Sequence, residues 1–296
     1  MQEMATLIKQ YLVYLEFVQN YTKVTVSWIK SSLNYFMNDN KIWYIYEINR
    51  NLVEEWLLNW RVYKKWKPST YVYHHKHLNW FYKWLEKKGI VEENFIKDIE
   101  KPKLENTLPK WLKKEEAELI LMSIKRLKYT YKYETTRNYT VIATMLLTWL
   151  RRFEILNLHI NDIQLNEMYI NVVQGKWRKD RIVPISTRLS VIFHDYIKER
   201  ERLNKKCEHF FTTSQYDKPM GVRCIDVLVK KLRQKTKIDF SSHSLRHTFA
   251  TLMLEWGCDI YTLSKMMWHS KITTTTIYLA CSPKQMLKSI EKHPLN

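Results

Sequence analysis

Two boxes near the C-terminus decide the fold: H-S-L-R-H-T-F-A-T at residues 243–251 and W-H-S-K-I-T-T-T-T-I-Y at residues 268–278. An arginine guanidinium can clamp two phosphate oxygens, a histidine can transfer a proton near neutral pH, and a tyrosine hydroxyl can act as a nucleophile. The boxes contain all three types of side chain, in His243, Arg246, His247, His269 and Tyr278. Such a set indicates chemistry at a phosphodiester.

The first box is predicted to open a helix. Ser241, Ser242 and Ser244 are residue types that cap helix N-termini. His243 and Arg246 are three residues apart, so they share one face of that helix. Both lie in its first turn, where free N–H groups and the helix dipole favour an anion.

The order and spacing of the two boxes resemble those of the tyrosine recombinase (phage integrase) family, most closely its small Xer-like members. That family carries H-x-L-R-H and then L-G-H-x-x-I-x-T-T-x-x-Y. The resemblance implies two further elements upstream, and both are present. T-W-L-R-R-F-E-I-L-N-L at residues 148–158 matches T-G-L-R-x-x-E-L-x-x-L, and Q-G-K-W-R-K-D-R at residues 174–181 matches the hairpin G-K-G-x-K-x-R.

The resemblance implies how the phosphodiester is cut. Tyr278 would attack the scissile phosphate and form a 3′-phosphotyrosyl link. Lys176, on the hairpin, would protonate the departing 5′-oxygen, with Lys179 as the nearby alternative. Arg151 and Arg246 would stabilise the charge that builds on the nonbridging oxygens.

The remaining polar residues of the motifs take smaller parts in this scheme. By resemblance, His243 acts as a general acid or base near the nucleophile, and His269 donates a hydrogen bond to the phosphate. His247 and Glu154 are interpreted as supporting residues. Rejoining by a 5′-hydroxyl conserves the bond energy, so no nucleotide cofactor is expected, and the sequence offers no acidic cluster for a metal.

Composition agrees with a polyanionic partner. The chain has 296 residues, a net charge of +19 and a pI of about 9.6, with lysine and arginine spread along its length. This favours nucleic acid over a membrane. The expected partners are double-stranded DNA recombination sites, with a homo-tetramer on two sites implied by the resemblance; accessory proteins stay open.

Cysteine usage and hydropathy indicate a cytoplasmic protein. Cys207, Cys224, Cys258 and Cys281 are far apart and form no C-x-x-C pair, which fits a reducing compartment and excludes a zinc knuckle. No signal peptide is recognised at the N-terminus. The longest apolar run, residues 141–150, is too short to span a bilayer and is predicted to be a core helix.

The predicted fold is mainly α with a small β-sheet. Residues 1–100 are expected to form a four-helix, SAM-like core-binding domain that clamps DNA, with helices near residues 7–18, 25–37, 52–63 and 68–89. Two prolines make residues 101–110 a linker. Residues 111–296 form an α+β catalytic domain with a C-terminal tail helix and a three-stranded antiparallel sheet at residues 160–163, 168–173 and 181–185, and Phe210–Phe211 is read as a short strand or edge.

Three histidines on the fourth predicted helix, His74, His75 and His77, could suggest a metal site. Adjacent positions on a helix diverge by about 100°, and no acidic or cysteine ligand lies nearby. We therefore interpret them as a polar or DNA-facing surface.

Tryptophan stands at three positions where the family has glycine: Trp149, Trp177 and Trp268. The chain has 12 tryptophans and only 4 glycines. One hypothesis is that the gene uses UGA for glycine and was translated with UGA as tryptophan; Trp66 is a fourth candidate. The alternative is true substitution in a divergent element, and the codons distinguish the two.

Two other functions remain open at the level of sequence. A DNA-binding regulator could keep the fold without catalysis, which the tryptophan substitutions mildly favour and the intact set of polar residues opposes. A type IB topoisomerase-like relaxing enzyme would share the chemistry. The Xer-like length and the basic N-terminal helices favour a recombinase.

Overall fold

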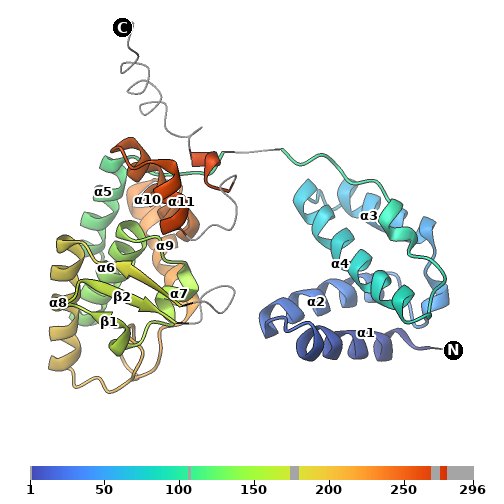
Figure 1. Cartoon of the computed structure of the whole chain (residues 1–296), viewed down its shortest axis with the longest axis horizontal. Helices are drawn as coiled ribbons and strands as arrows, with labels where there is room; N and C mark the ends of the chain where they lie inside the picture. Colours follow the sequence, from blue (N-terminus) through green and yellow to red (C-terminus); the bar gives the residue numbers. More distant parts are fainter. Residues whose placement is uncertain (1, 106–107, 174–179, 268–273, 279–296) are drawn as a thin grey trace, which may run out of the picture. The chain divides into compact units, whose positions relative to one another are not determined.

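The computed structural model describes residues 2–105, 108–173, 180–267 and 274–278 (Figure 1). The chain divides into two compact units at Asn106 and Thr107, inside the stretch predicted to be a linker. Each unit has its own hydrophobic core. In the described part of the chain, no helix is both long enough and apolar enough to cross a bilayer.

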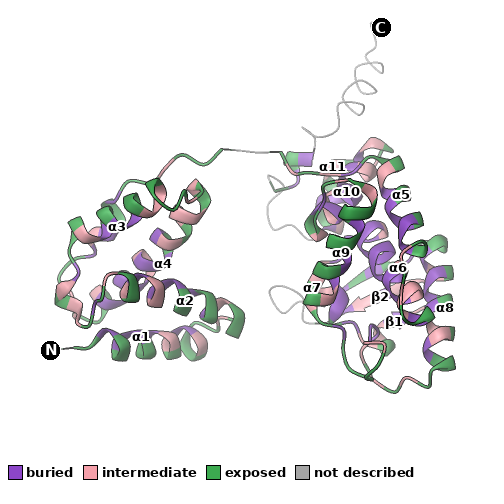
Figure 2. Cartoon of the chain, turned by 180° about the vertical axis from the view of Figure 1, so that it is seen from behind, coloured by how far each residue is buried: buried purple, intermediate pink, exposed green. Residues whose placement is uncertain are grey.

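The N-terminal unit is helical. Its α-helices are α1 (Met4–Val13), α2 (Lys23–Asp39), α3 (Arg50–Val62) and α4 (Pro68–Lys87). Short π or 3-10 turns accompany them, η1 (Tyr14–Val18), η2 (Ile45–Glu47) and η3 (Phe95–Asp98). The predicted helices are present, with bounds that differ by a few residues, and apolar side chains from all four meet in one core (Figure 2).

Helix α4 shows how the sequence sets these bounds. Pro68 occupies its first turn, where the fixed φ of proline suits a helix and its missing N–H is not needed. At the other end Gly89 takes a left-handed conformation with φ 68°. Its N–H donates to the Glu86 carbonyl at 3.0 Å, and that of Ile90 donates to Leu85 at 3.0 Å. This paired arrangement closes the helix.

The interpretation of the three histidines as a polar surface is wrong. His75 and His77 are only 1% and 6% exposed, because α4 packs against α2 on one side and η3 on another. His74 lies 2.8 Å from the Ser32 hydroxyl through Nδ1 and stacks on Trp66 with ring centroids 4.4 Å apart. Burial lowers the pKa of His74 and of His77 to about 4, so both are neutral at pH 7.

The C-terminal unit combines helices with a small sheet. Its described helices are α5 (Lys114–Lys125), α6 (Lys132–Leu147), α7 (Arg152–Leu156), α8 (Thr187–Arg202), α9 (Val222–Thr236), α10 (Ser242–Glu255) and α11 (Ile260–Met266). The strands β1 (Ile163–Gln164), β2 (Tyr169–Val172) and β3 (Arg181–Pro184) pair antiparallel in that order. Two 3-10 turns, η4 (Ile160–Asp162) and η6 (Thr276–Tyr278), complete the set. The predicted fold class, mainly α with a three-stranded antiparallel sheet, is confirmed.

Helix α6 is the centre of this unit and touches α5, α8 and α10. Its residues are mostly buried, and Val141, Ile142 and Ala143 are fully so (Figure 2). The helix begins earlier than predicted and ends at Leu147, because Thr148 takes an extended conformation. The residues between the end of α6 and the start of α7 are therefore not helical.

Two strand predictions are wrong in part. Residues 160–162 form the 3-10 turn η4 and not a strand, because the Asp162 carboxylate accepts a hydrogen bond from the His159 N–H at 2.7 Å and closes a tight turn. Phe210 and Phe211 form no strand. They are fully buried between single bridges at His209 and Thr212.

Candidate active site

Arg151 is fixed by a carboxylate at the start of α7. It is the N-cap residue of this helix, with φ −76° and ψ 152°. The Glu154 carboxylate accepts from the Arg151 N–H at 2.7 Å and from its guanidinium Nη1 at 3.0 Å. Glu154 also accepts from Arg181 Nη2, on β3, at 2.6 Å. One carboxylate therefore joins the helix start to the base of the hairpin.

This three-residue network is buried unevenly. The side chains of Glu154 and Arg181 are 9% and 3% exposed, whereas that of Arg151 is 32% exposed. Burial by itself raises the pKa of the Glu154 carboxyl, but hydrogen bonds from Arg181 and from the Arg151 backbone outweigh it and lower the pKa. The Glu154 carboxyl is therefore ionised. It binds Arg151 without burying it, so the Arg151 guanidinium remains partly exposed to solvent.

Glu154→Gln is expected to destabilise the protein by about 3 kcal/mol, because it leaves the buried Arg181 without a counter-charge. The carboxylate stabilises the fold at neutral pH, since its lowered pKa keeps it ionised there, and that contribution is lost as acid protonates it. Urea unfolding measures the change. Glu118→Gln is the matched control: this carboxylate pairs with Arg188 at 2.6 Å but is 34% exposed. The control should cost no more than about 1 kcal/mol; equal losses in the two variants would contradict the expectation.

Arg246 is the second guanidinium of the site. It lies on α10, whose N-cap Ser241 accepts from the Ser244 N–H at 3.2 Å. Its Nη2 donates to the Met267 carbonyl at 3.2 Å, and its Nη1 donates to the Trp149 carbonyl. These contacts tie the first box to the turn that precedes Arg151 and to the end of α11.

The two guanidiniums act on each other. Burial first, and then the charge of Arg151, lower the pKa of Arg246 to about 10, so Arg246 still carries its charge at neutral pH. Two like charges held near one another repel, and an anion between them relieves that repulsion. The pair is therefore suited to a phosphate.

Tyr278 reaches the same place from η6. Its side chain is buried, with 2% of the residue exposed, and its hydroxyl lies 3.0 Å from Nδ1 of His247 on α10. The two ring centroids are 5.6 Å apart. An ionised Tyr278 would raise the pKa of Arg246, which places the phenol within electrostatic range of the guanidinium. The sequence predicted the tyrosine but not this partner.

His243 lies in the first turn of α10, beside a hollow of about 820 Å³. Its lining includes the basic and hydroxyl residues Arg152, Lys230, Arg233, Ser241 and Ser242, together with the acidic residues Asp226 and Asp239. Arg152 is held there by an ion pair with Asp226, whose Oδ1 lies 2.6 Å from Nη1. This lining suits a backbone phosphate next to the site.

The structure brings Arg151, Arg246 and Tyr278 together, with His243 one turn before His247 on α10. Lys176 and His269, together with Lys179, Trp177 and Trp268, lie outside the described residues. Sequence reasoning did not identify Arg181 as the second partner of Glu154. Its signal was the arginine that ends the hairpin motif G-K-G-x-K-x-R, at a fixed spacing from Lys176.

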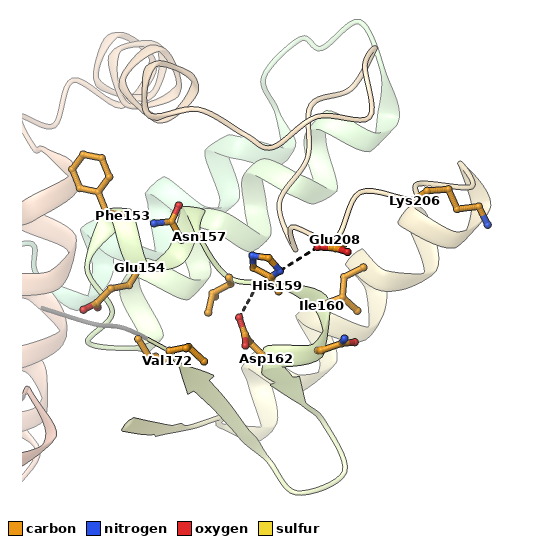
Figure 3. A pocket seen from close by; sticks show the side chains of 12 residues that line it. Phe153, Glu154, Asn157, His159, Ile160, Asp162, Val172, Lys206 and Glu208 are labelled. Atoms are coloured by element: carbon orange, nitrogen blue, oxygen red, sulfur yellow. Dashed lines mark hydrogen bonds and ion pairs between the residues drawn. The ribbon is translucent and has the colours of Figure 1, made fainter. Parts of the chain in front are cut away.

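A separate pocket of about 790 Å³ is lined in part by Phe153, Glu154 and Asn157, at α7 and its C-terminal end (Figure 3). Phe153, Val172 and Ile160 line it together with acidic groups. Nδ1 of His159 lies 3.9 Å from the Glu208 carboxylate in this pocket (Figure 3). It shares only Glu154 with the site above, and its acidic lining does not suit a phosphate. The described residues contain no group of three or more histidine, cysteine or acidic side chains arranged to hold a metal ion.

Trp149 is accommodated as a buried ring next to the site. It is 5% exposed, and its ring centroid is 5.7 Å from that of Phe249. Its indole N–H has no hydrogen-bond partner among the described residues. Trp66, in the N-terminal unit, likewise stacks on His74. Both rings occupy space that a glycine would leave unfilled.

Trp149→Gly is expected to destabilise the protein by about 3–5 kcal/mol, the cost of deleting a large buried aromatic side chain. Thermal unfolding measures the change. Trp256→Gly, at a residue that is 72% exposed, is the control and should lower the midpoint far less. If the thermal midpoint of Trp149→Gly were higher than that of the wild type, the native residue at this position would be glycine, as the UGA hypothesis requires.

Comparison with known proteins places these features in one family. The sequence model described as "Phage integrase family" matches residues 110–285. Tyrosine recombinase XerC of Caldanaerobacter subterraneus subsp. tengcongensis is 32% identical over 221 residues, which is 73% of this chain and 60% of that protein. Tyrosine recombinase XerD of Staphylococcus epidermidis is 26% identical over 299 residues, 98% of this chain and 99% of the relative.

Solved structures agree with the sequence matches. XerH site-specific recombinase bound to a palindromic difH substrate, in a post-cleavage complex, has a TM-score of 0.73 at 19% identity. The similarity covers 96% of this chain and 83% of that one. A lambda integrase dimer bound to a COC′ core site also has a TM-score of 0.73, at 14% identity, over 94% and 77% of the two chains. At these identities the structures establish a shared fold, and together with the match over residues 110–285 the chain belongs to the phage integrase family.

Proposed function

We propose that this protein is a site-specific DNA recombinase, or integrase, that cuts and rejoins DNA through a 3′-phosphotyrosyl intermediate. The observation that carries the proposal is that the guanidinium of Arg246 lies within electrostatic range of both the Tyr278 phenol and the Arg151 guanidinium. The XerC, XerD and XerH relatives are recombinases by name, and this supports the same assignment.

In the proposed reaction, Tyr278 attacks the scissile phosphate while Arg151 and Arg246 bind its nonbridging oxygens. The fork geometry of each guanidinium stabilises the charge that builds there. Lys176 protonates the departing 5′-oxygen. His243 acts as an acid or base near the nucleophile, and His269 donates a hydrogen bond to the phosphate.

The second half of the reaction reverses the first. A 5′-hydroxyl from the partner strand attacks the phosphotyrosine and releases Tyr278, so the bond energy is kept and no cofactor is required. Exchange between two sites needs an active centre for each strand, which is the reason to propose a tetramer on two duplexes. Residues 1–100 would clamp the DNA, joined through residues 101–110 to the catalytic domain 111–296.

The chemistry of the surface and the cysteines supports the same setting. A net charge of +19 suits a protein that covers many phosphates. The four cysteines are widely spaced and form no C-x-x-C pair, which suits a reducing compartment. We place the protein in the cytoplasm, in contact with DNA.

The test is covalent trapping. A binding site is first selected from random-sequence duplexes with the full chain. It is then rebuilt with a nick near the scissile phosphate, so that the cut fragment diffuses away and the adduct accumulates. A protein–DNA adduct that survives denaturation supports the proposal. A protein that binds the site but forms no adduct is a regulator with a recombinase fold.

A second arm separates recombination from topoisomerase activity. Plasmids with one or two copies of the selected site are incubated with the protein. A recombinase yields deletion or inversion products only when two sites are present. Relaxation of the one-site plasmid without such products would support the topoisomerase-like alternative.

A further inference from the structure

His247 is in direct contact with the oxygen that the proposed function makes the nucleophile. Its Nδ1 lies 3.0 Å from the Tyr278 hydroxyl. Residues of α10 and η6 form this pair, so two elements far apart in sequence bring the imidazole to the phenol. Tyr278 is buried, so this contact lies where bulk water has little access to the reacting oxygen.

The surroundings of His247 keep its imidazole neutral. Burial lowers its pKa, and the nearby charges of His243 and Arg246 lower it further. A neutral imidazole has one unprotonated ring nitrogen that can accept a proton. With the ring proton on Nε2, the acceptor is Nδ1, the atom that faces the phenol.

An unassisted phenol is a weak nucleophile at neutral pH. Its pKa of about 10 leaves roughly one molecule in a thousand ionised at pH 7. The field of Arg151 and Arg246 favours the phenolate, but the proton still has to move to an acceptor within hydrogen-bond reach. Nδ1 of His247 is within that reach before any DNA is bound.

We propose that His247, in place of His243, is the general base that takes the Tyr278 proton in the cleavage step, and this proposal rests on the recombinase function proposed above. The Tyr278 O–H bond breaks and its proton goes to Nδ1, while the phenol oxygen bonds to phosphorus. The bond from phosphorus to the 5′-oxygen breaks, and that oxygen takes a proton from Lys176. In rejoining, the 5′-oxygen bonds to phosphorus and its proton goes back to Lys176, while the bond from phosphorus to the phenol oxygen breaks and the imidazolium of His247 returns its proton to that oxygen.

Charge balance fits this sequence of events. Protonated His247 would add a positive charge beside Arg246, which is costly without an anion. The pentavalent transition state carries additional negative charge on the nonbridging oxygens at the moment when the imidazole gains its proton. The base is therefore strengthened when the phosphate is in place, and it stays neutral in the free protein.

The test measures single-turnover adduct formation on two versions of the nicked site. One has the normal 5′-oxygen, and the other has sulfur as the bridging atom, a leaving group that needs no proton. The key variant is His247→Asn, whose amide can keep a hydrogen bond near the position of Nδ1 but cannot accept a proton. Lys176→Ala is the comparison, since its defect concerns only the leaving group.

His247→Asn should form adduct about 10²–10³-fold more slowly than the wild type on both sites, the usual contribution of a general base. Lys176→Ala should be slow on the oxygen site and recover most of its rate on the sulfur site. His247→Ala should regain rate when imidazole is added. Rates for His247→Asn within threefold of the wild type, or its recovery on the sulfur site, would overturn the proposal.

Two controls keep the outcomes separate. If the wild type itself forms no adduct, the proposed recombinase function is wrong. If the wild type forms adduct and the His247 variants form it at the same rate, only the assignment of His247 as the base is wrong. DNA affinity and the thermal midpoint are measured for each variant. If His247→Asn does not unfold cooperatively, His247→Gln takes its place in the same comparison.

Discussion

Tyr278→Phe is expected to form no covalent adduct with DNA, while it binds the selected site with an affinity within about twofold of the wild type. The change removes one oxygen, the proposed nucleophile, and leaves the ring in its buried position. The lost contact with His247 should cost about 1 kcal/mol of folding free energy, the usual worth of one hydrogen bond. The midpoint should therefore fall by only about 2–4 °C.

Denaturing electrophoresis of the nicked site measures the adduct, and a gel-shift titration measures binding. Tyr261→Phe on α11 is the matched control, because Tyr261 is 61% exposed and its variant removes a hydroxyl from the same domain. It should form adduct at the wild-type rate. Adduct from the Tyr278→Phe protein would show that another group attacks the phosphate and would end the assignment.

The sequence was sufficient for the architecture because each local signal agreed with its neighbours. Pro68 and Gly89 bound α4 in the sequence and in the structure, and Ser241 caps α10. The failures come from contacts that the local sequence does not contain. Periodicity could not tell that Asp162 folds back on the His159 N–H and turns a predicted strand into η4.

The histidine cluster shows a second limit. A run of histidine, lysine and aromatic residues on one helix resembles a surface, yet α4 packs on more than one side. Burial of His75 and His77 therefore depends on contacts of α4 with α2, much earlier in the chain, and with the 3-10 turn η3, which follows α4. Long-range packing decides such cases, and a single sequence does not report it.

The same distinction between local and long-range information applies to the candidate site. Motif spacing predicted Arg151, Arg246 and Tyr278 as site residues, since each occupies a fixed place in a motif. The spacing did not reveal that Arg181 shares the Glu154 carboxylate, or that His247 faces the phenol. Those contacts join β3 to α7 and α10 to η6, so only the folded chain shows them.

Arg246→Lys is expected to slow adduct formation by about 10³-fold, the upper range for loss of one preorganised donor at a reacting oxygen. Arg246 uses Nη1 and Nη2 on the carbonyls of Trp149 and Met267, and its planar fork is fixed by them. An ammonium on a flexible stem has neither the geometry nor the second donor pair. Burial beside Arg151 would also lower the pKa of the new lysine and favour its neutral form.

The Trp149 contact is made by a backbone carbonyl, so the loss does not depend on whether residue 149 is tryptophan or glycine. Arg202→Lys is the matched control, because Arg202 pairs with Glu199 on α8 and its side chain is 53% exposed; it should leave the rate unchanged. Adduct formation by Arg246→Lys within tenfold of the wild type would mean that a point charge is enough. The phosphate would then be bound by Coulombic attraction alone. The planar guanidinium of Arg246, held between α10 and the turn before α7, would not be needed for catalysis.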